Sequence, residues 1–211
     1  MTCYRNLRLV PLLAAVVLIS ACLAQPHPVK NIYSLLAEPL QPGEPTGPVT
    51  KPRTDRRTLL VGTVTAAAGF DNRALVYRVG EDRFETDFYN EFMAPPARLL
   101  ADQTAQYLDD RNRRVRVVKT PGLIIAQFGL ETYLEALYGD FTVEPPLAVV
   151  NIRFAVNDLR REAPRILMEK TYRQTVPLSA DNNAEALVAA MNEGLNLILE
   201  ELNRDIEKSI R

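Results

Sequence analysis

The fold class of this chain depends most on one stretch, Leu147-Ala148-Val149-Val150-Asn151-Ile152-Arg153-Phe154-Ala155-Val156. Its apolar and polar residues alternate, with Val150, Ile152, Phe154 and Val156 on one side and Asn151 and Arg153 on the other. A period of two residues is typical of a strand with one buried face. Asn157-Asp158 then predicts a turn, and 166–176 is expected to pair back as the second strand of a hairpin.

Another hairpin is predicted upstream, because 73–79 and 83–88 both alternate and flank the turn Gly80-Glu81-Asp82. Shorter apolar runs predict further strands, at 59–64, 115–118 and 123–128. The segment 131–141 is ambiguous, since its Glu, Leu and Ala residues favour a helix. We interpret it as a strand, because its tyrosine-rich alternation continues into Val143 and stops before Pro145-Pro146.

Two helices complete the expected fold. Pro95-Pro96 suits a helix start, where a missing N–H costs little, and this helix is expected to reach about Asp110. The final helix is expected from about Asn182 to Ile210, with Asp181 as its N-cap. Its apolar stripe consists of Ala184, Leu187, Met191, Leu195, Ile198, Leu202 and Ile206. The order of elements therefore predicts an α+β fold, with a mostly antiparallel sheet and helices packed on one face.

The N-terminus carries an export pattern. Arg5 and Arg8 precede a short apolar run, and Leu18-Ile19-Ser20-Ala21-Cys22 resembles the lipobox of bacterial lipoproteins. This resemblance implies that 1–21 is a signal peptide and that Cys22 becomes the acylated first residue of the mature chain. One alternative is a secretory signal with a chance cysteine. The other, an uncleaved membrane anchor, is disfavoured because Pro11 interrupts a run too short to span a bilayer.

The residues after Cys22 have the composition of a tether. The segment 22–56 holds 7 of the 15 prolines, and proline-dense chain behaves as a semi-rigid spacer. One apolar island at 32–36 is a candidate first strand, and 57–211 is expected to form the globular domain. Leu23 follows the cysteine, where lipoproteins retained at the inner membrane carry aspartate, so the lipobox resemblance implies the outer membrane.

Composition argues against several functional classes. A formal net charge of −1 does not match a nucleic-acid-binding protein, which needs a strongly basic face. The single histidine, His27, lies in the tether, so a Ser-His-Asp triad and a histidine-based zinc site are disfavoured. No glycine-rich nucleotide motif is present, and the adjacent acids, such as Asp109-Asp110, are expected to be solvated. We therefore expect no enzymatic activity, cofactor or metal, and a periplasmic hydrolase is the weakest of three hypotheses.

Two body segments remain as candidate contact sites. Arg111, Arg113 and Arg114 follow the expected helix and either compensate its C-terminal dipole or contact an acidic partner or phospholipid headgroups. The segment 87–96 is rich in aromatic residues and ends in two prolines. We interpret it as a corner that buries Tyr89 and Phe92, with a ligand contact as the alternative.

Three motifs resemble the ABC-type transport auxiliary lipoprotein family, the PqiC-like lipoproteins. They are Tyr33-Ser34-Leu35 after the lipobox, Arg73-Ala74-Leu75-Val76-Tyr77-Arg78, and Tyr89-Asn90-Glu91-Phe92-Met93-Ala94-Pro95-Pro96. The resemblance covers about 32–210. The chain departs from the family pattern in two places: Phe92 stands where tryptophan is frequent, and a proline-rich loop follows Leu36.

This resemblance implies a non-enzymatic outer-membrane lipoprotein that faces the periplasm. Its partners would be an MCE-domain protein and the associated ABC transporter, in a system that moves lipids or other hydrophobic molecules across the envelope. It also implies a domain similar to the TolB N-terminal domain, and self-association into a homo-oligomer. Cys22 is the one functional residue it supplies. The alternative hypothesis is an envelope assembly or structural lipoprotein, a scaffold not linked to transport.

Overall fold

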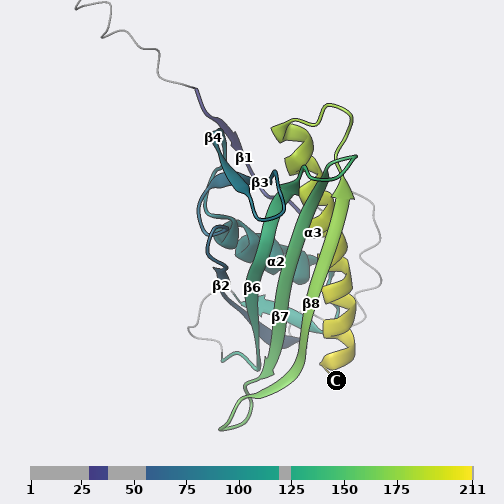
Figure 1. The fold of residues 1–211 in the computed structure, drawn as a ribbon. Coiled ribbons are helices and arrows are strands. Elements are labelled where there is room, and N and C mark those ends of the chain that lie inside the picture. The colour runs from purple at the N-terminus through teal and green to yellow at the C-terminus, as the bar shows by residue number, and fades with distance from the viewer. Residues whose placement is uncertain (1–28, 38–55, 119–124, 211) are drawn as a thin grey trace, which may run out of the picture. The chain divides into compact units, whose positions relative to one another are not determined.

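The computed structural model describes residues 29–37, 56–118 and 125–210. The chain divides into two compact units, and the second, Asn31–Arg211, contains every described helix and strand (Figure 1). The expected signal peptide, Cys22 and most of the proline-rich segment lie outside the described residues.

Eight described strands and two described helices form the domain. The strands are β1 (Asn31–Tyr33), β2 (Arg57–Ala66), β3 (Ala74–Arg78), β4 (Phe84–Phe92), β5 (Val115–Val118), β6 (Phe128–Asp140), β7 (Leu147–Asp158) and β8 (Arg165–Pro177). The helices are α2 (Pro96–Arg111) and α3 (Ala184–Ser209). The strand order is β1-β4-β3-β6-β2-β5, and the hairpin of β7 and β8 joins the sheet through β6.

The prediction of a mostly antiparallel sheet is wrong. Of the seven strand pairings among the described residues, four are parallel: β1 with β4, β2 with β5, β2 with β6, and β3 with β6. The antiparallel pairings are those between chain neighbours, β3 with β4, β6 with β7, and β7 with β8. Alternation of side chains identifies strands and local hairpins, but parallel pairing joins strands through long crossovers that no local pattern reveals.

The individual elements mostly follow the sequence. The strand interpretation of 131–141 is confirmed by β6, and the start of α2 at Pro96 is confirmed as well. The strand expected at 123–128 is wrong where it is described, because β6 begins only at Phe128. The N-cap of α3 is Asn183 rather than Asp181, since the Asn183 side chain accepts a 2.8 Å hydrogen bond from the Ala186 N–H.

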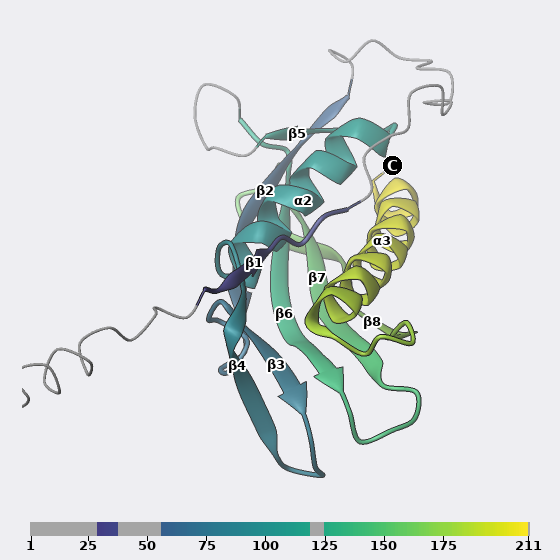
Figure 2. The same cartoon turned by 90° about the horizontal axis from the view of Figure 1, so that it is seen from above.

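Both helices cover the same face of the sheet (Figure 2). α3 packs on β7 and β8, and α2 packs on β2 and β5. The core between these layers contains Phe92, Phe128, Phe154, Leu187 and Met191, all less than 2% exposed. The expected helices on one face are therefore confirmed, while the likeness to the TolB N-terminal domain stays a prediction.

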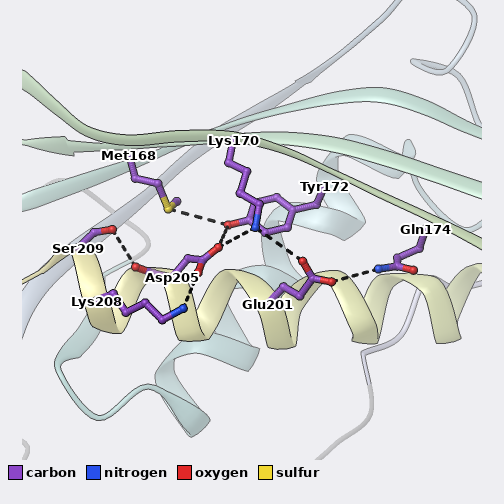
Figure 3. A network of polar contacts seen from close by, with 8 residues as sticks. All are labelled: Met168, Lys170, Tyr172, Gln174, Glu201, Asp205, Lys208 and Ser209. Atoms are coloured by element: carbon purple, nitrogen blue, oxygen red, sulfur yellow. Dashed lines mark hydrogen bonds and ion pairs between the residues drawn. The ribbon is translucent and has the colours of Figure 1, made fainter.

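A polar network attaches α3 to the edge strand β8 (Figure 3). The Asp205 carboxylate accepts hydrogen bonds from Lys170 Nζ at 2.9 Å and from the Tyr172 hydroxyl at 3.0 Å. Gln174 Nε2 donates to Glu201 Oε1 at 3.3 Å one turn earlier on the helix. Burial, and next the bond to Asp205, raises the pKa of Tyr172, so this phenol stays protonated and remains a donor.

These donors keep the Asp205 carboxyl ionised to lower pH than an ordinary aspartate. Partial burial alone would raise the pKa of its carboxyl, but hydrogen bonds from Lys170, Tyr172 and Lys208 outweigh burial and hold the pKa below its usual value. A carboxyl whose pKa is lower in the folded state adds stability above its unfolded pKa of about 4. That contribution is lost as the pH falls through the folded-state pKa.

Replacing Asp205 with alanine is expected to lower the free energy of unfolding by about 1–2 kcal/mol at pH 7, because the buried Tyr172 hydroxyl loses its acceptor. The difference from wild type should shrink below about pH 4. Urea unfolding at pH 7 and again below about pH 4 measures the free energy of unfolding of the variant and of the wild type. Glu200→Ala is the control, since Glu200 is half exposed and pairs only with Arg204 at 4.0 Å. A pH-independent difference would contradict the assigned role of the ionised carboxylate.

Candidate functional site

One edge of β2 is open along most of its length. β5 pairs only with the first four residues of β2, Arg57–Leu60. Beyond Leu60, no strand within the described ranges pairs with that side of β2, whereas its other side pairs with β6 as far as Ala66. The β2–β6 register shifts between Val61 and Val64, so a bulge lies in the middle of the open edge. In the part of the chain that the structure describes, the backbone groups of Val61–Ala66 on this side have no paired strand.

A groove of about 510 Å³ runs between this edge and the first half of α2. It is lined mainly by apolar and small residues: Leu60, Val61, Gly62, Thr63, Val64, Pro95, Ala97, Ala101 and Ala105, with Arg98 and Asp102. Alanines at three positions on the helix keep the groove wide, because their side chains end at Cβ. Arg98 and Asp102 are exposed and supply one charge of each sign along α2.

This geometry suits an extended peptide. An unpaired strand edge offers main-chain donors and acceptors to a further strand, and a neighbouring apolar groove can receive alternate side chains of that strand. The volume lies within the range of ligand-binding clefts, roughly 300–1,000 Å³. The described residues thus contain a surface that can bind a partner segment without any catalytic group.

A second hollow lies on the face of the sheet away from the helices. Its volume is about 340 Å³, and its lining includes Thr65, Tyr133, Arg153 and Glu169. Arg153 forms ion pairs with Glu135 at 3.3 Å and Glu169 at 3.1 Å, and its guanidinium lies 5.2 Å from the Tyr133 ring centroid. The Arg153 guanidinium is thus already engaged by two carboxylates and a ring, so this smaller hollow is the weaker candidate for binding.

The three predicted arginines lie at the C-terminal end of α2. The Arg111 guanidinium stacks over the Tyr107 ring at 4.4 Å, and the Arg114 guanidinium donates to the Ile210 carbonyl at 3.4 Å. The Arg113 backbone N–H donates to Glu207, while its side chain is exposed. Arg56, which sequence reasoning did not select, joins them by donating to the Asn112 carbonyl at 3.1 Å. The cluster therefore satisfies carbonyls at the ends of both helices and still exposes positive charge.

Sequence reasoning missed the groove completely. It depends on how α2 lies beside Leu60–Val64 of β2, and neither element carries a local signal of the other's position. Within the described ranges, no three His, Cys, Asp or Glu side chains are grouped so as to hold a metal ion. In the same ranges, no helix has the length and apolar character needed to cross a bilayer.

Comparisons with known proteins complete the description of the chain. A family model described as ABC-type transport auxiliary lipoprotein component matches residues 39–203. The fold is similar to that of protein XCC0632 from Xanthomonas campestris, with 17% identity, a TM-score of 0.65, and coverage of 82% of this chain and 92% of that one. Hypothetical protein CT253 from Chlamydia trachomatis is similar over 74% of this chain and 98% of its own, at 11% identity and a TM-score of 0.54. No curated protein matches the chain.

Proposed function

Because the chain belongs to the family of ABC-type transport auxiliary lipoprotein components, we propose that it is a non-enzymatic accessory subunit that docks an ABC-driven transport system. In this proposal the system is of the MCE type and moves lipids or other hydrophobic molecules across the envelope. The subunit is held at the outer membrane and faces the periplasm, and it assembles with further copies of itself.

The membrane attachment is assigned to Cys22, where the lipobox-like pattern ends. Two or more acyl chains give stable anchoring, because each buried methylene contributes about 0.8 kcal/mol. Asn31, the first residue of β1, is only nine positions after Cys22, so the connecting chain spans at most about 30 Å. The proposed anchor therefore keeps the domain close to the membrane surface.

The open edge of β2 beside the α2 groove is the observation that best supports a docking role. A subunit without chemistry of its own contributes by binding, and this surface provides backbone hydrogen-bonding groups next to an apolar channel. An extended segment of a transport partner would pair with Val61–Ala66 and place alternate side chains against α2. Arg111, Arg113 and Arg114 are proposed as a separate contact for an acidic partner surface.

A photocrosslinking amino acid placed at Arg98 in living cells tests this docking role. Arg98 is exposed and lines the groove, so the expected product is a covalent adduct with an MCE-domain protein or the ABC permease. Gln106 is the matched control, because it is exposed on the same helix but lies outside the groove lining, and it should give no such adduct. Mass spectrometry of the purified adduct identifies the partner.

Other products of the same experiment would count against transport. Adducts to a β-barrel or to wall-bound proteins, with no transporter component, would favour the scaffold hypothesis. Equal capture from Arg98 and Gln106 would show that the groove is not the docking surface. Repeating the capture after replacing Arg113 and Arg114 with serine tests the arginine contact, which should weaken the yield without abolishing it.

A further inference from the structure

β4 contains a wide bulge organised by one carboxylate. Val76 of β3 lies opposite Thr86, yet Ala74, two residues earlier, lies opposite Glu91. The four residues 87–90 therefore face a single position of β3, and β4 contains three extra residues. Asp87 Oδ1 accepts the backbone N–H groups of Tyr89 at 2.7 Å and Asn90 at 3.0 Å. Its Oδ2 accepts the Tyr77 hydroxyl at 2.6 Å and Asn90 Nδ2 at 2.8 Å. The four bonds fix the course of the bulged backbone.

The bulge exposes two aromatic rings. Phe88 is 61% exposed and Tyr89 is 54% exposed, and their rings meet edge to face with centroids 5.2 Å apart. The prediction that Tyr89 is buried in a corner is therefore wrong, although Phe92 is buried as expected. Water contact of two adjoining aromatic rings is unfavourable, so a rigid bulge that presents them marks a contact surface.

Further apolar side chains are exposed on β1 and just after the end of β4. Ile32 on β1 lies opposite Glu91, and the Met93 N–H, just after β4, donates to the Tyr33 carbonyl at 2.7 Å. Both Ile32 and Met93 are more than half exposed. We call Ile32, Phe88, Tyr89 and Met93 the β1–β4 apolar patch. Glu91 pairs with Arg73 at 2.6 Å, while the half-buried Asp87 carboxylate keeps its negative charge inside the bulge, where four hydrogen-bond donors surround it.

The patch lies where the tether joins the domain. Asn31, the first residue of β1, is directly opposite Asn90, the residue that follows Tyr89. The chain that leads back to Cys22 therefore leaves β1 beside the aromatic pair. The arginine cluster lies elsewhere, beside β5, and β3 and β4 occupy the other end of the sheet (Figure 2).

We propose that the β1–β4 apolar patch inserts into the interfacial layer of the phospholipid membrane that holds the lipid anchor. This inference rests on the proposed lipidation of Cys22. The eight residues between Cys22 and Asn31 hold the start of β1, beside the patch, within about 30 Å of the anchor, where the membrane is the nearest apolar phase. Aromatic rings with a polar edge favour the headgroup level, and a few buried apolar side chains suffice for a second attachment. The anchor and the patch together fix the orientation of the domain on the bilayer.

Tryptophan fluorescence can test this directly, because the sequence contains no tryptophan. The full-length lipidated variant Phe88→Trp is reconstituted into vesicles of phosphatidylethanolamine and phosphatidylglycerol, with or without brominated acyl chains. Its emission should lie at shorter wavelength than that of tryptophan in water. Brominated lipid should quench most of this emission. Met93→Trp serves as a second reporter in case Phe88→Trp folds poorly.

Ile166→Trp is the matched control. Ile166 is 57% exposed and lies opposite Asn157, near the end of β7. Asn157 in turn lies opposite Gly129, near the start of β6 and away from β3 and β4. Its emission should resemble that of tryptophan in water and should not respond to brominated lipid. Equal quenching of Ile166→Trp and Phe88→Trp would overturn the proposed orientation.

The possible outcomes test the membrane contact of the patch separately from the lipidation of Cys22. Protein that fails to float with the vesicles would overturn lipidation at Cys22, and the inference with it. Protein that floats but shows no quenching at 88 or 93 would overturn the membrane contact alone. A short-wavelength emission that bromine does not quench would also overturn it and would instead assign the patch to an interface with a second copy.

Discussion

Replacing Phe154 with alanine is expected to lower the free energy of unfolding by about 3–5 kcal/mol. Phe154 is 0% exposed and lies on the central stretch of β7, with its ring 5.8 Å from the Tyr172 ring in an edge-to-face contact. The substitution removes the ring from between the sheet and α3, and close-packed neighbours on both strands cannot fill the space. The Tyr172 ring, whose hydroxyl donates to Asp205, also loses its edge-to-face contact with Phe154.

Urea unfolding followed by circular dichroism measures this loss. Arg153→Ala is the control, because Arg153 is the adjacent residue on β7 but lies on the opposite, exposed face of the sheet. That control should change stability by less than about 1 kcal/mol. A loss below about 1 kcal/mol for Phe154→Ala would show that the layer between β7 and α3 can collapse around the missing ring.

Replacing Cys22 with serine is expected to abolish stable membrane attachment. Serine has no thiol to accept a diacylglyceryl group, and the chain after Cys22 is proline-rich and offers no apolar stretch that could replace two acyl chains. The protein should move from the membrane fraction to the soluble periplasmic fraction, or remain as uncleaved precursor. Intact-mass measurement of the wild-type chain should show cleavage before Cys22 and the added mass of the acyl groups.

Cys3→Ser is the matched control, because Cys3 is the other cysteine of the sequence and lies inside the expected signal peptide. It should leave both attachment and the mature mass unchanged. Membrane recovery of Cys22→Ser at the wild-type level would contradict the lipobox assignment and would favour an uncleaved anchor.

The elements that the sequence predicted correctly are those with local signals. The alternation in 147–156 identified β7, and the same period of two outweighed helix propensity in β6. Pairing between distant strands has no such signal. β2 lies between β5 and β6, and both pairings are parallel, so they required knowledge of the crossovers and not only of the strands.

The errors in detail arise from side-chain hydrogen bonds. Asn183 caps α3 because its side chain reaches the Ala186 N–H, and composition alone does not distinguish it from Asp181. Tyr89 is exposed because Asp87 organises four hydrogen bonds around a bulge, which breaks the alternation assumed for a buried corner.

The candidate sites also divide into those with a local sequence signal and those without one. The lipobox-like pattern and the arginines could be named from the sequence because a contiguous motif carries each of them. The α2 groove could not, because it forms between two elements distant in the sequence, where three alanines of α2 lie beside β2. The β1–β4 apolar patch likewise needed the register between strands 59 residues apart, which places Asn31 opposite Asn90.

The position of β3 has a mechanical consequence for an anchored protein. β3 meets β6 at two paired positions, Tyr77 with Gly139 and Arg78 with Asp140, and the Arg78–Asp140 ion pair at 3.2 Å reinforces the second. A pull on the tether enters at β1, and it reaches the rest of the domain by two routes. One is this junction of β3 with β6, and the other is the segment after β1, where Leu36 and Ala37 donate backbone N–H groups to Asn192 of α3 at 3.0 Å and to Gln103 of α2 at 2.9 Å. Tension between membrane and partner would therefore be shared between the short β3–β6 junction and the segment after β1, whose Leu35 is buried in the core, so a pull on the anchor would be resisted by both helices as well as by the sheet.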